Sequence, residues 1–329
     1  MKFEDLFQQF DALTVAVVGD VMLDTYWWGR VERISPEAPV PVVAVSKKEY
    51  RIGGAGNVAL NTKALGASTK LFSVIGHDDD AAILLPLLQE QGIDTRYIIQ
   101  SKERITTNKI RIMGRNQQMM RLDAEYTHDI TATDEALLLQ RFTTFLQQQQ
   151  PAVVIFEDYN KGVLTENLIH TMISLCKAQG VVTTVDPKRK NFFAFKGIDI
   201  FKPNLKEVKE GLNLLADDTT ETGLCNIHAL LQQQLNHHIS LITLSEKGVF
   251  YQGNQQAGII PSHIRNIADV SGAGDTVIAV ASLVYAATRN IQLAAEAANI
   301  AGGLVCEEVG TATINKSLLL KECTKLLMA

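Results

Sequence analysis

Residues 269–275 read DVSGAGD, and the apolar run TVIAVASLVYAA follows immediately. The run is typical of a buried helix, and the small residues before it leave the main chain bare where the helix begins. Unpaired amides at a helix start attract anions. Gly272, Ala273 and Gly274 would supply those amides, and Asp275 could accept a proton from a hydroxyl attacking phosphorus. The simpler interpretation is a glycine turn with an acidic first helical residue.

Around this segment, short β-branched runs alternate with helical patterns. Strands are predicted at 14–20, 69–76, 152–158, 181–187 and 238–245, and two helices, at 275–288 and 293–308, are expected to close the chain. This alternation predicts an α/β fold with a mostly parallel central sheet and helices on both faces. The helix-poor stretches near 25–50 and 97–123 predict a small β lid. We expect one domain over residues 1–329, since no low-complexity linker divides them.

Composition excludes several classes. The net charge of −5 argues against a nucleic-acid partner. Because no apolar run reaches the roughly 20 residues of a membrane span, no membrane partner is expected. The four cysteines, at 176, 225, 306 and 323, form no CxxC pair and indicate neither a disulfide framework nor a zinc site. The N-terminal MKFEDLFQQF lacks the pattern of a signal peptide, so we expect a cytoplasmic protein.

A second glycine cluster, GGAGN at 53–57, also precedes a helical pattern. Its spacing differs from that of a dinucleotide-binding fingerprint. Gly53 and Gly54 would let a small polar ligand approach the backbone, and the Asn57 amide could bond hydroxyl groups. The alternative is a plain turn into a helix.

Three further segments carry candidate residues. KPNLKE at 202–207 has a capping-box pattern, with Asn204 and Glu207 three positions apart. TLSEKG at 243–248 is a strand end followed by a turn. EDYNKG at 157–162 ends an apolar strand, and ligands of parallel sheets lie beyond such strand ends. Asp158 and Lys161 are therefore pocket candidates, as is Asp24 after the first strand.

In this order the motifs resemble those of the ribokinase-like (PfkB) sugar kinases. GGAGNVA is similar to the first signature of that family and DVSGAGD to the second, with KPNLKE and TLSEKG between them. The resemblance covers nearly the whole chain. One departure is Val270, which stands where the family usually has threonine. It leaves unchanged the residues 272–274 that would supply the amides, and Asp275.

The resemblance implies phosphorylation of a sugar hydroxyl with ATP and Mg²⁺ as cofactors. Asp275 would be the base, residues 272–274 the anion hole, and Asn204 and Glu207 would handle phosphate and magnesium. The remaining implied residues fall into three groups: Thr243, Ser245, Lys247, Gly248 and Asn299 at the nucleotide; Asp24, Gly53, Gly54, Asn57, Asp158, Lys161 and Arg121 at the substrate; and Asp269, Ser271 and Gly310 at a K⁺-like ion.

Residues 19–43, which contain RISPEAPVPV, resemble one subgroup, the heptose-7-phosphate kinases of lipopolysaccharide-core synthesis. Those enzymes phosphorylate the anomeric hydroxyl of D-glycero-D-manno-heptose 7-phosphate to the 1,7-bisphosphate, on the route to ADP-heptose. Many are fused to an adenylyltransferase domain. This sequence contains no HxGH motif, so we expect a kinase without that domain.

A substrate that already carries a phosphate needs cations away from the transferred group. Candidates by type and position are Lys161, Lys188, Arg189, Arg111 and Arg121, although any one of them could be an ordinary solvated charge. The lid edges suggest a homodimer. Two alternatives stay open: a kinase of this family for another sugar, such as a ribokinase or phosphofructokinase, and a non-catalytic sugar or nucleotide sensor.

Overall fold

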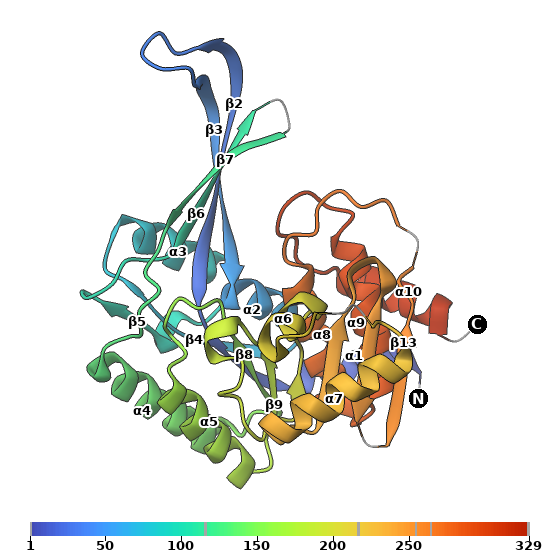
Figure 1. Cartoon of the computed structure of the whole chain (residues 1–329). Helices are drawn as coiled ribbons and strands as arrows, with labels where there is room; N and C mark the ends of the chain where they lie inside the picture. The colour runs from blue at the N-terminus through green and yellow to red at the C-terminus, as the bar shows by residue number, and fades with distance from the viewer. Residues whose placement is uncertain (1, 115–116, 216–217, 254, 264, 328–329) are drawn as a thin grey trace.

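The computed structural model describes residues 2–114, 117–215, 218–253, 255–263 and 265–327. Helices and strands alternate along most of the chain (Figure 1). The elements in order are α1 (Phe3–Gln9), β1 (Thr14–Gly19), β2 (Val21–Ile34), β3 (Pro41–Gly54), α2 (Ala55–Ala64), β4 (Ser68–Gly76), α3 (Asp79–Glu90), β5 (Ile98–Ser101), β6 (Asn108–Gly114), β7 (Gln117–Ala124), α4 (Ala132–Gln149), β8 (Val153–Glu157), α5 (Glu166–Ala178), β9 (Val182–Asp186), β10 (Ile200–Phe201), α6 (Leu205–Leu212), α7 (Glu221–Leu235), β11 (Ile239–Thr243), β12 (Val249–Gly253), β13 (Gln256–Ile260), α8 (Ala273–Thr288), α9 (Ile291–Val305) and α10 (Lys316–Leu327).

The large sheet has the strand order β13-β12-β11-β10-β9-β8-β1-β4-β5. Neighbours from β11 to β5 pair in parallel, whereas β12 pairs antiparallel with both β11 and β13. The predicted mostly parallel sheet is thereby confirmed. The carboxyl ends of β1, β8 and β9 lie side by side, since Gly19 pairs with Glu157 and Glu157 with Asp186.

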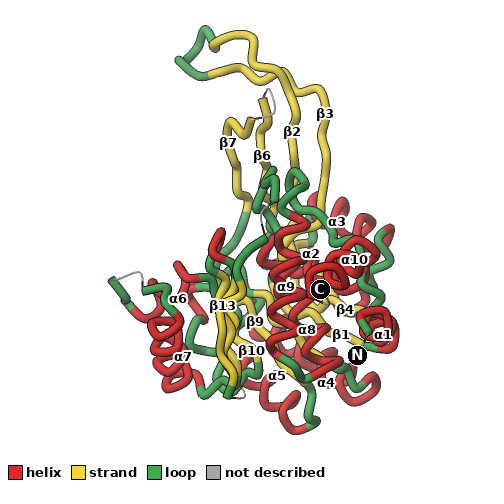
Figure 2. The backbone as a smooth tube through the Cα atoms, turned by 90° about the vertical axis from the view of Figure 1, so that its right-hand side faces the viewer, coloured by secondary structure: helices red, strands yellow, loops and turns green. Residues whose placement is uncertain are grey.

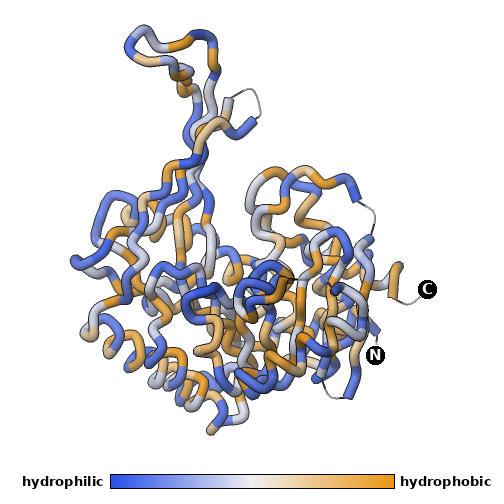
Figure 3. Tube along the Cα trace, in the orientation of Figure 1, coloured by the Kyte–Doolittle hydropathy of each residue, from blue (hydrophilic) through white to orange (hydrophobic). Residues whose placement is uncertain are grey.

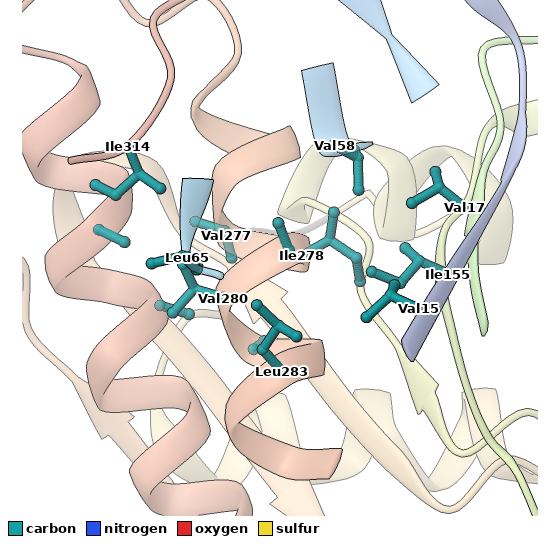
Figure 4. Packing of buried hydrophobic residues seen from close by; sticks show 14 of the residues in the cluster. Val15, Val17, Val58, Leu65, Ile155, Val277, Ile278, Val280, Leu283 and Ile314 are labelled. Carbon is teal, nitrogen blue, oxygen red and sulfur yellow. The ribbon is translucent and has the colours of Figure 1, made fainter. Parts of the chain in front are cut away.

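Helices cover both faces of this sheet (Figure 2). Val15 and Val17 of β1 face the core under α1, α2, α8, α9 and α10, whereas Ala16 and Val18 face the core under α4, α5 and α7. Figure 4 shows α8 side chains packed among those of α2, β1 and β8. Apolar residues that surround α8 on all sides explain why its sequence is apolar throughout. This packing fixes where the first turn of α8 lies.

A second sheet, with the order β3-β2-β6-β7, projects from the body as a lid (Figures 1 and 2). The expected lid at 25–50 is present, but the expected lid at 97–123 is wrong in its first part. Residues Ile98–Ser101 pair with β4 in the large sheet, because Ile98 and Ile99 are buried there. β3 is an edge strand, consistent with its prolines. Hydrophobic residues also occur along the projecting lid (Figure 3).

The chain does not close with two helices as expected, because α10 follows α9. Its pattern is amphipathic rather than apolar, and Leu319 and Cys323 are its buried residues. They join the same core as α1 and α9. A short helix that buries so few residues gives a weak sequence signal.

Candidate active site

Asp275 lies in the first turn of α8, only 3% exposed. The chain enters this helix through Gly272, whose φ of +80° is a left-handed conformation that suits glycine. Asp275 Oδ2 accepts a hydrogen bond from Asn57 Nδ2 at 2.7 Å, and Oδ1 accepts one from the Tyr159 hydroxyl at 2.8 Å. Burial raises the pKa of Asp275 to about 6, although these two donors lower it. The group is thus a stronger base than an ordinary aspartate.

Beside Asp275 the helix start forms an open cradle. In the described part of the chain the amides of Gly274 and Asp275 have no acceptor, while the amide of Ala273 reaches the Val270 carbonyl at 3.3 Å. A side chain on Gly274 would begin 3.4 Å from Asp186 Oδ2 and 3.7 Å from Lys202 Nζ. Free amides, a helix dipole and a lysine therefore converge where an anion could bind.

Two lysines and two carboxylates form a cluster at one side of the cradle. Asp186, at the end of β9, accepts from Lys188 Nζ at 3.0 Å and pairs with Lys202 Nζ at 2.7 Å. Lys188 Nζ also reaches Glu207 Oε1 at 2.6 Å. Burial would raise the pKa of Asp186, but the two lysines outweigh it and lower that pKa. Two carboxylates thus already share one cation, an arrangement suited to a divalent ion and its waters.

The capping box predicted in KPNLKE is present. Asn204 Oδ1 accepts from the Glu207 amide, and Glu207 Oε2 accepts from the Asn204 amide, both at 2.8 Å. This box uses one oxygen of Glu207 and directs the other at Lys188. Glu207 therefore has a capping role and a position in the charged cluster, so the two interpretations of this motif do not exclude each other.

Tyr159 was not singled out by sequence analysis, although it lies in the quoted EDYNKG. Two ammonium groups lie near its ring, with Lys109 Nζ 5.0 Å and Lys188 Nζ 5.5 Å from the ring centroid. Burial, with Asp275 next, raises the pKa of Tyr159 well above its ordinary value, so its hydroxyl stays protonated and donates to Asp275. Its position just after a predicted buried strand could have identified Tyr159 as a candidate site residue.

Asp20 and Glu157 were also missed. Asp20 follows β1 and accepts hydrogen bonds from the amides of Tyr159, Lys161 and Val163 at 2.8, 3.0 and 3.1 Å. It therefore shapes the loop that holds Tyr159. Glu157 is fully buried at the end of β8, and neither carboxyl oxygen has a hydrogen-bond partner among the described residues. Burial, then Asp186 and Asp275, raise its pKa well above the ordinary value.

The predicted nucleotide residues lie along one continuous path. Thr243 forms a bridge with Asn204, and its amide reaches the Pro203 carbonyl at 3.1 Å. Ser245 and Lys247 form the following 3-10 turn, and Lys247 Nζ contacts the Thr219 hydroxyl at 3.0 Å. Gly248 packs on residues 260–262, where a side chain would begin 2.0 Å from the Ile260 carbonyl oxygen. Asn299 of α9 donates to the neighbouring Pro261 carbonyl at 2.9 Å.

Asp24, Gly53, Gly54 and Asn57 lie where the lid meets the body. Asp24 is buried and pairs with Arg111 at 2.6 Å. A side chain on Gly53 would begin 2.5 Å from Asp24 Oδ2, and Gly54 has a φ of +58°. The two glycines thus bring the β3 backbone close to Asp24 and place Asn57 in the first turns of α2.

Residues 12–318 match the family described as pfkB family carbohydrate kinase. The chain belongs to this family. It is therefore a sugar kinase, a phosphotransferase with an alcohol group as acceptor, and the resemblance drawn from DVSGAGD and GGAGNVA is confirmed. Asp275 and the cradle of residues 272–274 lie within the matched region of this kinase.

Relatives in sequence share much of this kinase chain. It is 41% identical over 318 residues to the bifunctional protein HldE of Methylobacillus flagellatus and 37% identical over 316 residues to that of Geobacter sulfurreducens. These matches cover 95% of the chain and 63% of each relative. The chain thus spans less than two thirds of these proteins.

Solved structures confirm the ribokinase-like fold. Phosphofructokinase-2 from Escherichia coli in complex with potassium matches with a TM-score of 0.80 at 16% identity, covering 96% of this chain and all of that one. Arabidopsis thaliana ribokinase complexed with ribose and ATP matches with a TM-score of 0.73 at 15% identity, covering 94% and 99%. At such identities the likeness concerns the fold alone.

Several predicted substrate residues of this pfkB kinase make contacts within the protein. Both oxygens of Asp158 are engaged, by the Asn160 amide at 2.8 Å and the Asn191 side chain at 3.2 Å. Burial raises the pKa of Asp158 to about 7. Lys161 pairs with Glu125 at 2.7 Å. These hydrogen bonds hold Asp158 in the loop after β8.

The cations proposed for a distal phosphate are not all brought together. Arg121 pairs with Asp123 at 2.8 Å on the lid, and Arg111 lies beside it on the neighbouring strand. Lys188 lies instead in the carboxylate cluster, and Arg189 is exposed in a separate turn. Only Arg111, Arg121 and Lys161 remain near the lid base.

The structure does bring together the residues suggested for a monovalent ion. Asp269 accepts from the Ser271 amide at 3.0 Å, the Ser271 hydroxyl at 2.8 Å and the Gly310 amide at 2.9 Å. Burial would raise the pKa of Asp269, but these donors outweigh it and lower that pKa. Within the described residues, no group of three or more His, Cys, Asp or Glu could hold a metal ion. The same residues contain no helix long and apolar enough to cross a bilayer.

Proposed function

We propose that this chain transfers the γ-phosphate of ATP to the anomeric hydroxyl of D-glycero-D-manno-heptose 7-phosphate, forming the 1,7-bisphosphate used in ADP-heptose and lipopolysaccharide-core synthesis. The observation that carries the proposal is the placement of Asp275, a buried carboxylate with a raised pKa next to unpaired helix amides. A base beside an anion site is what an attacking hydroxyl and a migrating phosphoryl group require.

The residues of the chain have separate tasks in this reaction. Asn57 and the Tyr159 hydroxyl hold the Asp275 carboxylate, which takes the proton of the attacking hydroxyl. The amides of Gly274 and Asp275, together with Lys202, face the charge of the transferred group. Thr243, Gly248 and Asn299 line the path proposed for the nucleotide.

Two ions accompany the proposal. Bound Mg²⁺ would neutralise charge on the phosphates of ATP, and the fit rests on Asp186 and Glu207, which already converge on the Lys188 ammonium. Asp269 has a lowered pKa and is therefore an anion at neutral pH, so the loop of Asp269, Ser271 and Gly310 could hold a K⁺ ion.

The proposed sugar is supported by the lid and by the relatives. Residues 19–43 resemble the heptose-7-phosphate kinases, and the bifunctional HldE proteins align over 95% of the chain. The lid carries Lys109, Arg111 and Arg121 above the site, cations that suit a phosphorylated sugar. Because ATP and sugar phosphates are cytoplasmic metabolites, we propose the cytoplasm as the setting.

The decisive experiment measures ATP turnover with heptose 7-phosphate, fructose 6-phosphate, ribose 5-phosphate and ribose. The proposal expects the highest kcat/KM for heptose 7-phosphate and a product phosphorylated at the anomeric carbon, identified by ³¹P NMR. Turnover of ribose or fructose 6-phosphate without heptose 7-phosphate would assign the chain to another member of the family. Absence of turnover with every sugar, together with retained nucleotide binding, would favour the sensor.

We also propose a homodimer that forms through the lid. Cross-strand partners share a face, and one face carries Trp27, Ile110, Ile112, Met120 and Leu122 and is apolar except for Lys48, which lies over the Trp27 ring. Met120 is 56% exposed and Leu122 is 43% exposed. The other face carries charged side chains and lies toward the active site, so the apolar face is the one a second copy could cover.

A further inference from the structure

The charged face of the lid consists of two cross-strand rows. In the row nearer the body, Arg51, Asp24, Lys109 and Asp123 are neighbours; in the next row, Glu49, Tyr26, Arg111 and Arg121 are neighbours. Directly paired residues project to the same side of a sheet. This side faces the active site, because Arg51 donates to the Val309 carbonyl at 2.7 Å and Lys109 lies over the Tyr159 ring.

Most cations near this face already have an acidic partner. Arg51 pairs with Glu49 at 2.7 Å and Arg111 with Asp24 at 2.6 Å. Arg121 pairs with Asp123 at 2.8 Å and Lys161 with Glu125 at 2.7 Å. Each of these pairs is neutral as a unit. A ligand phosphate would have to compete with a carboxylate for any of them.

Lys109 differs from its neighbours because no carboxylate pairs with it among the described residues. Its ammonium group lies over the Tyr159 ring, 5.0 Å from the ring centroid. The side chain is half-buried. Burial lowers the pKa of Lys109; Asp24 and Glu125 oppose that change, while Lys161 and Arg121 add to it. A half-buried lysine without an ion pair of its own has a partly desolvated charge, which a bound anion would stabilise.

The position of Lys109 relative to the base is set by Tyr159. The Lys109 ammonium group lies over the Tyr159 ring, and the Tyr159 hydroxyl donates a hydrogen bond to Asp275 at 2.8 Å. Lys188 also lies over the ring, but it is held by Asp186 and Glu207 in the cluster that faces the cradle. A lysine at the lid and a lysine at the cradle thus lie near the same tyrosine, and no described carboxylate pairs with the one at the lid.

We propose that Lys109 binds the phosphate that the acceptor sugar already carries, and that this contact selects a sugar phosphate over the free sugar. The inference rests on the proposed function, since it concerns the acceptor side of the same site. Arg111 and Arg121 lie on the same face and support the local positive potential, while their carboxylate partners keep them in place. Lys109 is not among the candidate cations predicted from the sequence.

Calorimetry without nucleotide tests the inference. The wild-type protein is titrated with heptose 7-phosphate, fructose 6-phosphate and ribose 5-phosphate, and with the same three sugars without their phosphates. The sugar phosphate that binds most tightly, together with its free sugar, is then used to compare the variants. For Lys109→Met we expect the phosphosugar to bind roughly 10- to 100-fold more weakly, the loss of one charge-assisted hydrogen bond. Binding of the free sugar should not change, and Lys109→Arg should recover most of the affinity.

Lys102→Met is the matched control, since Lys102 is an exposed lysine in the segment leading to β6. It should bind like the wild type. Three results would overturn the inference. Wild type and Lys109→Met could bind the phosphosugar equally well, or Lys109→Met could lose the same affinity for the phosphosugar and for the free sugar. The third result is a wild type that binds no phosphosugar more tightly than its free sugar. If Lys109→Met does not fold, unchanged discrimination in Lys109→Gln decides against it. If the wild type binds another sugar phosphate more tightly than heptose 7-phosphate, only the proposed substrate is refuted. The role of Lys109 is then tested with that sugar phosphate.

Discussion

The Tyr159 hydroxyl donates to Asp275 Oδ1 at 2.8 Å, although 116 residues separate them in the sequence. Asn57, from a third segment, donates to the other oxygen at 2.7 Å. Both oxygens of the carboxylate are therefore held by neutral donors. These donors fix its orientation, and burial keeps its pKa raised although Lys202 and the two donors lower it.

Replacement of Asp275 by Asn should remove the base and leave the helix start in place. We expect kcat to fall by about 10²- to 10⁴-fold, the usual contribution of a general base. ATP binding should be retained, since the amides and Lys202 are unaffected. Steady-state kinetics and nucleotide calorimetry check the two expectations. An unchanged kcat would exclude Asp275 from the mechanism.

The rate should depend on the protonation of Asp275. Since its pKa is about 6, kcat should be constant above that pH and should fall as the pH decreases through it. Tyr159→Phe removes a hydrogen bond that lowers this pKa, so the pKa should rise and the acid limb should move to higher pH. Rate profiles between pH 5 and 9 for both proteins test this. A limb that stays in place or moves to lower pH contradicts the assignment.

Glu207→Gln separates capping from the role in the charged cluster. A glutamine oxygen can still accept the Asn204 amide, so the free energy of unfolding should change by less than about 1 kcal/mol. The loss of charge beside Lys188 should raise the Mg²⁺ concentration needed for half-maximal rate. Glu210→Gln, on the same helix and paired with Lys206 at 3.8 Å, is the control. Equal Mg²⁺ dependence in the two variants would argue against Glu207.

Leu283 lies in the middle of α8 and is fully buried. Leu283→Ala should lower the free energy of unfolding by about 2–5 kcal/mol, because a cavity remains next to the main sheet. Leu230→Ala, at a position of α7 that is 42% exposed, should cost much less. Urea denaturation followed by circular dichroism measures both. Similar losses would contradict the packing described for α8.

Met120→Lys tests the proposed dimer, since it places a charge in the apolar face of the lid. Sedimentation velocity should show a dimer for the wild type and a shift toward monomer for the variant. Arg30→Lys, a conservative lid substitution, should leave the dimer intact. A monomeric wild type, or an unaffected dimer in Met120→Lys, would refute the proposed interface.

The elements with the strongest local patterns could be predicted from the sequence. β1, β8 and β9 are short buried parallel strands, and α8 is an apolar helix entered through glycines, so their composition alone identified them. The capping box of α6 was likewise predictable, because its two residues are three positions apart. α10 and the assignment of residues 98–101 to the large sheet were not, since both depend on partners distant in sequence.

The sequence by itself determined the family, the parallel α/β order, and the carboxylate and glycines at the start of α8. These depend on composition and spacing within single segments, where neighbouring residues are adjacent by covalent connection. Only the tertiary structure decided that Tyr159 and Asn57 hold Asp275, that Asn191 holds Asp158, and that no described carboxylate pairs with Lys109. Those properties depend on strand register and helix packing, which bring together side chains from distant segments. Asn57 and Asp275, for example, are 218 residues apart in the sequence.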